Sequence, residues 1–430
     1  MKKLIFLFLI IGLFVWGEVK FDYGFDLRLR EEYLGGIFAP APPSGYEDDN
    51  YFRVKLSLWG KWDINGNNTI FIRFSGEPRF YVEKGGFLSR GRSRSDDEFI
   101  FENLYFEFKK LFNSNWDLKI GRQDLLMQYG EGFIIMEGTP GDGSRTFYFN
   151  ALKATYHFNE KNLIDLIFLY DPVEDFMPII NDVHKKLVNS EEKGVILYGK
   201  LNPSQKISLE PYYIYIDRDA YTIGTITTPA LGLNTIGTRA VYKFDPWKLR
   251  GELAYQWGNY ANGNDKQGFG GYLFLTRTFK EVKFMPSIDI GFAYLSGDNP
   301  DTTTKDEGWD PLYGKWPWIS ELLLYYYFYD GEIAKFTNYN LWRTSLNLLL
   351  TKDTSLSLSY NYFRANQPNP TFGLGTTSLT RGHIPTLILR HKFTPNISSH
   401  FWFEYFVPGE YYPATHENSF FFRWELAFKF

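Results

Sequence analysis

The sequence predicts an all-β fold, a transmembrane antiparallel β-barrel of about eighteen strands with short periplasmic turns and long extracellular loops. Three observations support this prediction. Apolar and polar residues alternate strictly in many segments, the connections between these segments are short and long in turn, and Phe, Trp and Tyr make up 20% of the chain at a mean hydropathy of only −0.31. In such a barrel lipid-facing residues alternate with lumen-facing ones, and aromatic side chains collect at the membrane interfaces.

The N-terminus has the features of a secretory signal peptide. Lys2 and Lys3 precede an apolar run over residues 4–16, and Gly17 supplies the small residue at which a signal peptidase cleaves. A membrane-anchoring helix is the weaker interpretation, because the run is shorter than the roughly 20 residues that span a bilayer. We therefore expect a signal peptide over residues 1–17 and one barrel domain over residues 18–430.

The first and last expected strands show the alternation most clearly. Over residues 19–30 the odd positions are apolar or aromatic and the even positions are mostly charged, and over residues 419–430 the even positions are aromatic or Leu. A period of two is the signature of a strand with two different faces. The chain ends on Phe430, which we expect to be recognised by the machinery that assembles such barrels, and this strand should close the barrel against the first.

The connections fix the expected number of strands. Tight connections lie at residues 63–67, 202–204, 245–246, 352–353 and 395–396, and long ones at 35–50, 81–96, 126–144, 171–192, 218–232, 297–335, 365–383 and 408–418. Residues 321–329 have the composition of a strand but no alternation, and counting them would make the total odd. Since bacterial barrels have even strand numbers, we assign this segment to the long loop, folded into the barrel mouth.

Several motifs carry a resemblance to a known family. They are LKIGRQ at residues 118–123, YGEG at 129–132, GTPGDGSRTFYF at 138–149, WDPLYG at 309–314 and YNYFRA at 360–365. In these motifs the chain resembles the alginate-export family of outer-membrane β-barrels. The resemblance implies an eighteen-stranded pore in the bacterial outer membrane and, for its best-known member, export of an anionic polyuronate through a lumen lined by arginine and lysine.

The parity of each expected strand independently predicts a lumen with more basic than acidic residues. Charged side chains avoid lipid, where Arg or Lys at mid-depth costs about 2 to 4 kcal/mol, but this cost does not explain an excess of positive sign. We therefore favour anion preference over a mixed, unselective lumen. The candidate pore-lining and solute-binding residues are Arg28, Arg30, Arg53, Lys55, Arg73, Lys119, Arg122, Arg145, Lys153, Arg239, Lys243, Arg343 and Arg390.

Two of these candidates have an alternative role. Arg122 has outward parity, but the preceding Gly121 allows a bulge that would turn its side chain inward. It could equally brace the following loop. Arg145 follows a glycine-rich stretch, where either a salt bridge between loops or a contact at the pore mouth is plausible.

Composition excludes several other classes of function. The chain has no cysteine, which excludes disulfides and thiol chemistry. Its formal net charge is −4, or −6 once Lys2 and Lys3 are removed, so no basic character indicates nucleic-acid binding. The six histidines are scattered and no serine lies in a recognised nucleophile context, so we do not expect an enzyme.

No cofactor is expected, with one weak exception. Asp298, Asp301, Asp306 and Asp310 crowd one long loop, and oxygen-rich clusters of this kind can hold Ca²⁺. Their spacing does not match that of an EF-hand, and acidic residues are common in solvated loops.

The sequence as a whole predicts a monomeric outer-membrane channel that passes anionic solutes or an anionic polysaccharide by diffusion. Its expected partners are membrane lipid, lipopolysaccharide and the solute. The alternatives are a general, weakly selective porin for small nutrients and a loop-mediated adhesin or structural barrel without transport.

Overall fold

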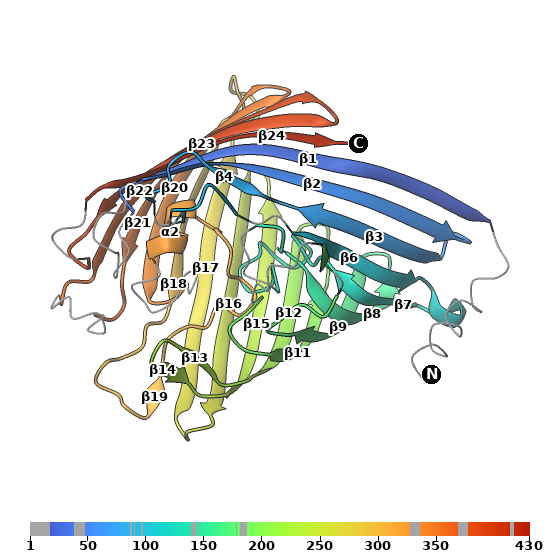
Figure 1. Cartoon of the computed structure of the whole chain (residues 1–430), viewed down its shortest axis with the longest axis horizontal. Coiled ribbons are helices and arrows are strands. Elements are labelled where there is room, and N and C mark those ends of the chain that lie inside the picture. The colour runs from blue at the N-terminus through green and yellow to red at the C-terminus, as the bar shows by residue number, and fades with distance from the viewer. Residues whose placement is uncertain are drawn as a thin grey trace.

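The strands close into an antiparallel barrel of eighteen strands, as the sequence predicts (Figure 1). The computed structural model describes residues 18–37, 48–86, 88–89, 91–95, 98–138, 143–145, 147–177, 179–180, 187–326, 336–368, 377–412 and 417–430; the expected signal peptide lies outside them. In their order round the barrel the strands are β1 (Val19–Gly35), β2 (Asp49–Ile64), β3 (Asn68–Gly76), β6 (Phe99–Phe108), β7 (Trp116–Gln123), β8 (Phe149–Asn159), β9 (Asn162–Asp171), β11 (Glu192–Lys200), β12 (Ile207–Arg218), β15 (Leu231–Phe244), β16 (Trp247–Tyr260), β17 (Asp265–Thr278), β18 (Ser287–Leu295), β20 (Tyr339–Thr351), β21 (Thr354–Arg364), β22 (Thr380–Thr394), β23 (Ile397–Pro408) and β24 (Ser419–Lys429).

The first and last strands form the closing seam, which Figure 1 shows as blue β1 beside red β24. Their register pairs Leu29 with Leu426 and Asp26 with Lys429. Below this pair the Phe25 amide donates to the Phe430 carbonyl at 2.7 Å, and the Phe430 amide donates to the Phe25 carbonyl at 2.9 Å. The expectation that the terminal strand closes against the first is confirmed.

The alternation in the sequence places apolar side chains on the outer face of the barrel. On β1 the side chains of Val19, Phe21 and Tyr23 are 52%, 53% and 72% exposed. Leu56 and Leu58 on β2 are likewise exposed, whereas the intervening Ser57 is buried on the lumen side. Burial of every second residue on the lumen side follows from the two-residue period of a strand.

The two ends of the barrel differ in their connections, and we call them the turn end and the loop end. At the turn end β2 and β3 are joined by a tight turn in which Asn65 and Gly66 have φ angles of 58° and 70°, the left-handed geometry that favours such residues in hairpins. Two connections depart from the expected asymmetry. Residues 261–264 join β16 to β17 tightly at the loop end, and residues 279–286 form a longer link at the turn end.

The connections contain the remaining elements. In the described part of the chain no helix is long and apolar enough to cross a membrane. The short elements are β4 (Arg79–Tyr81), β5 (Arg94–Ser95), the 3₁₀ helix η1 (Leu111–Asn113), β10 (Ile179–Ile180), β13 (Tyr221–Ile223), β14 (Ile226–Thr228), β19 (Lys305–Asp306) and the helix α2 (Glu321–Tyr326).

Two loop-end connections pack against each other and against residues of the barrel wall. They comprise the described parts of residues 124–148, which we call the first inner loop, and of residues 296–338, which we call the second inner loop. Ile135 of the first forms a parallel β-bridge with Tyr313 of the second. Both residues are buried and belong to a hydrophobic cluster that includes wall residues such as Ile196 and Ile214. The apolar core of this protein is therefore built from loops and wall together.

The helix α2 docks on the wall at β23 and β24. Glu404 of β23 accepts hydrogen bonds from the Glu321 and Leu322 amides, both at 3.1 Å, and from the Ser320 hydroxyl. The side chain of Leu322 is fully buried. The segment that resembles a strand in composition is therefore a helix as far as residue 326, and it lies in the loop as predicted; residues 327–329 lie outside the described residues.

A buried ion network ties the closing seam to this helix. Glu32 on β1 is 2% exposed and accepts hydrogen bonds from Arg423 Nε at 2.6 Å, Arg30 Nη1 at 3.2 Å and Arg53 Nη1 at 3.3 Å. Arg423 also donates to Glu321 Oε1 at 2.5 Å. One carboxylate thus neutralises cations from three neighbouring strands.

We predict that Glu32→Gln destabilises the barrel by about 3 kcal/mol, because it leaves buried guanidinium groups without their shared countercharge. The measurement is the free energy of unfolding in urea of the detergent-folded protein. Lys352→Gln, which removes a charge that is 91% exposed in a turn, serves as the control and should change this free energy by less than about 0.5 kcal/mol. Equal effects of the two substitutions would contradict the assigned role of Glu32.

Candidate functional site

Basic residues of neighbouring strands lie side by side on the lumen face near the seam. Arg28 is the register partner of Lys55, and Arg30 is the register partner of Arg53. Like charges directly opposite each other on two strands are destabilising. Carboxylates must therefore stand between them.

Each of these cations has a carboxylate partner. Glu77 accepts from Arg28 and, at 2.8 Å, from Arg53 Nε. Glu425 binds Arg30 at 2.6 Å, and Glu102 binds Lys55 at 2.5 Å. The predicted basic wall is thus largely neutralised where it is densest.

The same holds for other predicted cations elsewhere on the wall. Arg73 binds Asp26 at 3.1 Å, Lys119 binds Glu107 at 3.3 Å and Lys153 lies 3.7 Å from Asp165. Arg239 binds Glu210 of β12 at 2.7 Å and Glu131 of the first inner loop at 3.1 Å.

Three predicted lumen cations differ from these. Lys243 on β15, Arg343 on β20 and Arg390 on β22 form no side-chain hydrogen bond or ion pair with any residue that the structure describes. A charge that forms no ion pair is more available to an anion than a paired one, although Asp289 and Glu404 lie close enough to Arg343 for their charges to act on it. These three residues are therefore the candidates with the strongest claim to solute contact.

Arg122 and Arg145 occupy a different environment from the other candidates. Gly121 has φ of +123°, and the Arg122 side chain that follows it is completely buried. Arg122 forms a bidentate pair with Asp175 at 2.6 and 2.9 Å, and its guanidinium lies 4.2 Å from the Tyr148 ring. Arg145 binds the same Asp175 at 3.1 Å.

Arg145 completes a brace between three loop-end connections. It is 1% exposed and forms a bidentate pair with Glu98, at 2.8 Å to each oxygen. Glu98 precedes β6, Arg145 precedes β8 and Asp175 follows β9. The geometry favours the bracing role for both arginines, and it gives neither of them an exposed surface that a solute in the lumen would contact.

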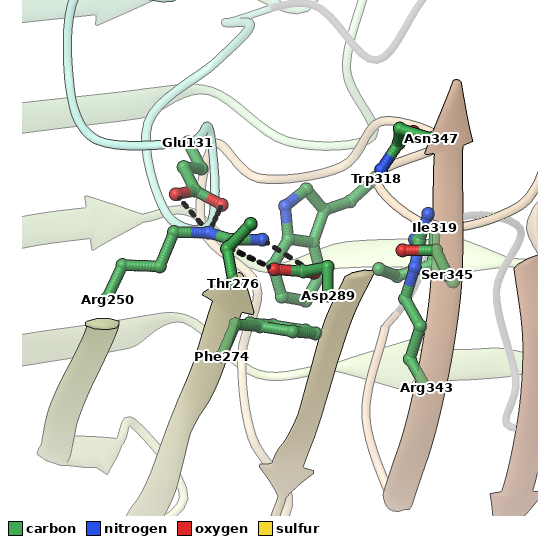
Figure 2. A pocket seen from close by; sticks show the side chains of 10 residues that line it. All are labelled: Glu131, Arg250, Phe274, Thr276, Asp289, Trp318, Ile319, Arg343, Ser345 and Asn347. Atoms are coloured by element: carbon green, nitrogen blue, oxygen red, sulfur yellow. Dashed lines mark hydrogen bonds and ion pairs between the residues drawn. The ribbon is translucent and has the colours of Figure 1, made fainter. Parts of the chain in front are cut away.

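A cavity of about 300 Å³ opens where the second inner loop faces the wall (Figure 2). Trp318 and Ile319 line it from the loop, and Arg250 and Arg343 line it from β16 and β20. Arg250 is held by Asp289 at 2.6 Å and by Glu131 at 2.8 Å.

Several residues that shape this region were not among the sequence candidates. Glu131 belongs to the YGEG motif, but the sequence gives no sign that it bridges Arg239 and Arg250. The sequence could have predicted that Glu32 faces the lumen, because the alternation of β1 continues through this residue. The alternation of β23 places Glu404 on the lumen face, but its contact with α2 and the position of Trp318 depend on how the second inner loop docks, which no local pattern specifies.

The four aspartates considered for calcium do not form one metal-binding group in the described part of the chain. Among the described residues no group of three or more His, Asp or Glu side chains is placed to hold a metal ion. Asp306 binds Lys266 at 2.8 Å and Asp310 binds Arg218 at 2.7 Å, while Asp301 is exposed. These contacts give the carboxylates structural partners.

Asp298 in the second inner loop is an unusual carboxyl group. Burial raises its pKa to about 6, and the nearby charge of Asp306 acts in the same direction. The Glu307 amide donates to Asp298 Oδ1 at 3.0 Å. Proton uptake by this group therefore stabilises the packed loop.

The comparison with known families agrees with this architecture. The alginate export family model matches residues 19–373, which is most of the barrel. The chain belongs to the alginate export family. No curated protein matches the chain.

Solved structures with the same fold are outer-membrane channels of Pseudomonas aeruginosa. OccK8 (OprE) has 10% sequence identity and a TM-score of 0.58, with 96% of this chain and 98% of that chain covered. OpdQ has 11% identity and a TM-score of 0.58, with 95% and 97% covered. The structure of OpdK with vanillate has 9% identity and a TM-score of 0.58, with 95% and 98% covered. At such identities the likeness shows the fold, and with the family it identifies a porin-like, outer-membrane type of channel.

We predict that Arg122→Gln lowers the free energy of unfolding by about 3 kcal/mol, because it leaves Asp175 without its bidentate partner in a buried site. The same substitution should leave the reversal potential of the channel in a salt gradient unchanged. Urea unfolding and planar-bilayer recording measure the two quantities. A shift in reversal potential with unchanged stability would contradict the bracing role and favour the pore-mouth role.

We predict that packing of the second inner loop is tighter at pH 5 than at pH 7.5. Because the pKa of Asp298 is raised to about 6 in the folded loop above an ordinary value near 4, the folded state holds more protons between these values. Stability is therefore lost as the pH rises through this window. Protection factors from hydrogen–deuterium exchange at residues 299–307 measure the effect. Asp298→Asn should abolish the difference, whereas Asp301→Asn at an exposed position should retain it.

Proposed function

We propose that this protein is a channel of the bacterial outer membrane through which anionic solutes or an anionic polysaccharide pass by diffusion, without a chemical step. The observation that carries the proposal is a set of three lumen cations, Lys243, Arg343 and Arg390, that form no ion pair with any of the described residues. Carboxylates on the same walls are engaged elsewhere. Glu252 accepts from the Tyr212 and Tyr272 hydroxyls at 2.9 and 3.1 Å, and Glu404 holds the start of α2.

The positions of Lys243, Arg343 and Arg390 suit the passage of anions, because the three residues are spread over different parts of the wall. They lie on three separate strands, β15, β20 and β22, so no single site gathers several of them around one anion. Conduction requires sites that attract an ion and also release it. Each cation acts as a weak, separate site for a carboxylate or phosphate group.

A weakly selective porin for small nutrients is the second candidate. The extensive pairing of the other basic residues favours it, because a paired cation contributes little field to the lumen. The two inner loops also occupy part of the interior. This candidate predicts conduction of anions and cations to similar extents, and a barrel that conducts nothing would instead indicate an adhesin or a structural role.

The proposed location and partners follow from the outer face and the two ends. The exposed aromatic and aliphatic residues of the strands suit contact with lipid, and the long connections of the loop end suit contact with lipopolysaccharide. Phe430 has its backbone fixed to Phe25 while its ring is 53% exposed, which supports recognition by the barrel-assembly machinery. We propose that the protein is a monomer. Because β1 and β24 pair along the seam, no strand edge is left open there for a second copy to cover.

Planar-bilayer recording in a salt gradient tests the proposed selectivity. We expect a reversal potential of the sign that indicates anion preference in the wild-type protein. In the triple variant Lys243→Gln, Arg343→Gln, Arg390→Gln, this potential should move toward zero, because three positive charges leave the lumen.

The matched control removes three basic residues that are not free lumen cations. Arg364→Gln, Lys280→Gln and Lys352→Gln alter the loop and turn ends, where Lys280 is 58% and Lys352 is 91% exposed, and should leave the potential near its wild-type value. Cation preference of the wild-type channel would overturn the proposal.

A further inference from the structure

An arginine of β17 lies on the outer face of the barrel instead of in the lumen. Leu273 and Leu275 of this strand point outward and are 55% and 36% exposed. Arg277 follows at the same parity, one residue before the strand ends, and is also exposed. Its register partner on β18 is Ile288, which is 37% exposed. A guanidinium group therefore stands among apolar side chains that suit contact with lipid.

The spacing of aromatic residues places Arg277 at one edge of the apolar band. Its register partner on β16 is Trp247, and Trp257 lies ten positions further along that strand with the same outward parity. At about 3.4 Å per residue and a strand tilt of about 40°, the two tryptophans are separated by roughly 26 Å along the membrane normal. The apolar band of such barrels is about 25 Å tall and has aromatic residues at both edges. Trp247 and Arg277 thus lie at the turn-end edge, next to the level of the lipid headgroups.

Two aromatic rings hold the guanidinium of Arg277 in place. Its Cζ atom lies 5.0 Å from the centroid of the Trp247 ring and 4.6 Å from that of the Phe279 ring. Phe279 is fixed in turn, because its amide donates to the Pro286 carbonyl at 2.9 Å. Contacts with ring faces attract the cation but use none of its N–H donors in conventional hydrogen bonds. The side chain is therefore positioned while its donors stay available.

No carboxylate of the described residues pairs with Arg277. Its side chain forms no hydrogen bond or ion pair in the described part of the chain. Asp245, in the adjacent turn, is bound by Lys280 at 2.6 Å. The indole N–H of Trp247 likewise has no acceptor among the described residues. The outer face meets lipid, whose headgroup phosphates are the anions within reach, and a guanidinium binds phosphate through two parallel hydrogen bonds.

We propose that Arg277, Trp247 and Phe279 form a binding site for the phosphate of a phospholipid at the turn end of the barrel. The guanidinium donates to two phosphate oxygens, the indole N–H donates to a further lipid oxygen, and Leu275 and Ile288 contact the acyl chains. The ligand is a phospholipid and not lipopolysaccharide, because the turn end is the proposed periplasmic side and lipopolysaccharide occupies the opposite leaflet. The site rests on the proposed membrane location but not on the solute selectivity of the channel.

Photocrosslinking of the whole barrel in non-ionic detergent tests the site. The probe is phosphatidylglycerol with a diazirine next to its headgroup, and peptide mass spectrometry locates the crosslinks. We expect saturable crosslinking to residues 277–286. Unlabelled dioleoylphosphatidylglycerol should compete, whereas dioleoylglycerol, which has the same chains without the phosphate, should compete about tenfold less well because the charge-assisted hydrogen bonds are absent.

Substitutions separate the charge from the rings. Arg277→Gln should lower the crosslinking yield about fivefold or more, since the charge-assisted hydrogen bonds are lost, and Arg277→Lys should retain part of it. Trp247→Leu should lower the yield by a smaller factor, because the cation remains but loses one of its rings. Lys352→Gln removes a cation that is 91% exposed in another turn of the same end, and it should leave the yield unchanged.

Three results would overturn the lipid site. They are competition by dioleoylglycerol as strong as that by the phospholipid, full competition by inorganic phosphate alone, and an unchanged yield in Arg277→Gln. Because crosslinking is independent of current, an anion-selective channel without saturable crosslinks would refute the lipid site alone. Cation selectivity with intact crosslinking would refute the channel proposal alone.

Discussion

The need to neutralise charge inside the barrel governs most of this structure. Strand alternation sends polar residues to the lumen, and closure then sets basic residues of adjacent strands side by side, as with Arg30 and Arg53. Such a wall is stable only if carboxylates stand between the cations. Glu32, Glu77 and Glu425 fill this role at the seam. The lumen cations that pair with none of the described residues are for that reason informative about function.

The inner loops take part in the same neutralisation. Glu131 of the first inner loop joins Arg239 and Arg250 of two wall strands, and Glu321 of α2 joins Arg423. Apolar contacts add to these ion pairs, since Phe133 packs on Tyr272 and Trp309. The loops are thus parts of the lumen surface, and they determine which wall residues a solute can reach.

The sequence predicts the barrel well because its signals are local. A two-residue period fixes which face of β1 or β24 meets the lumen, and loop lengths fix the even strand number without any knowledge of distant contacts. Charge pairing depends instead on residues far apart in the chain, such as Arg30 and Glu425. Parity alone could therefore not separate the paired Arg239 from Arg343, which pairs with none of the described residues. The composition of residues 321–326 resembles that of a strand, but the structure has a helix there. The hydrogen bonds to Glu404 and the burial of Leu322 that accompany this helix involve distant residues, which composition does not report.

The docking of α2 constrains the order in which the molecule can be completed. Its contacts lie on β23 and β24, at sequence separations of 83 residues for Glu321 with Glu404 and 102 residues for Glu321 with Arg423. Arg423 is in turn oriented by Glu32, 391 positions away. The second inner loop therefore has no complete binding surface until the last strand has joined the first. Final docking of α2 therefore requires a closed barrel.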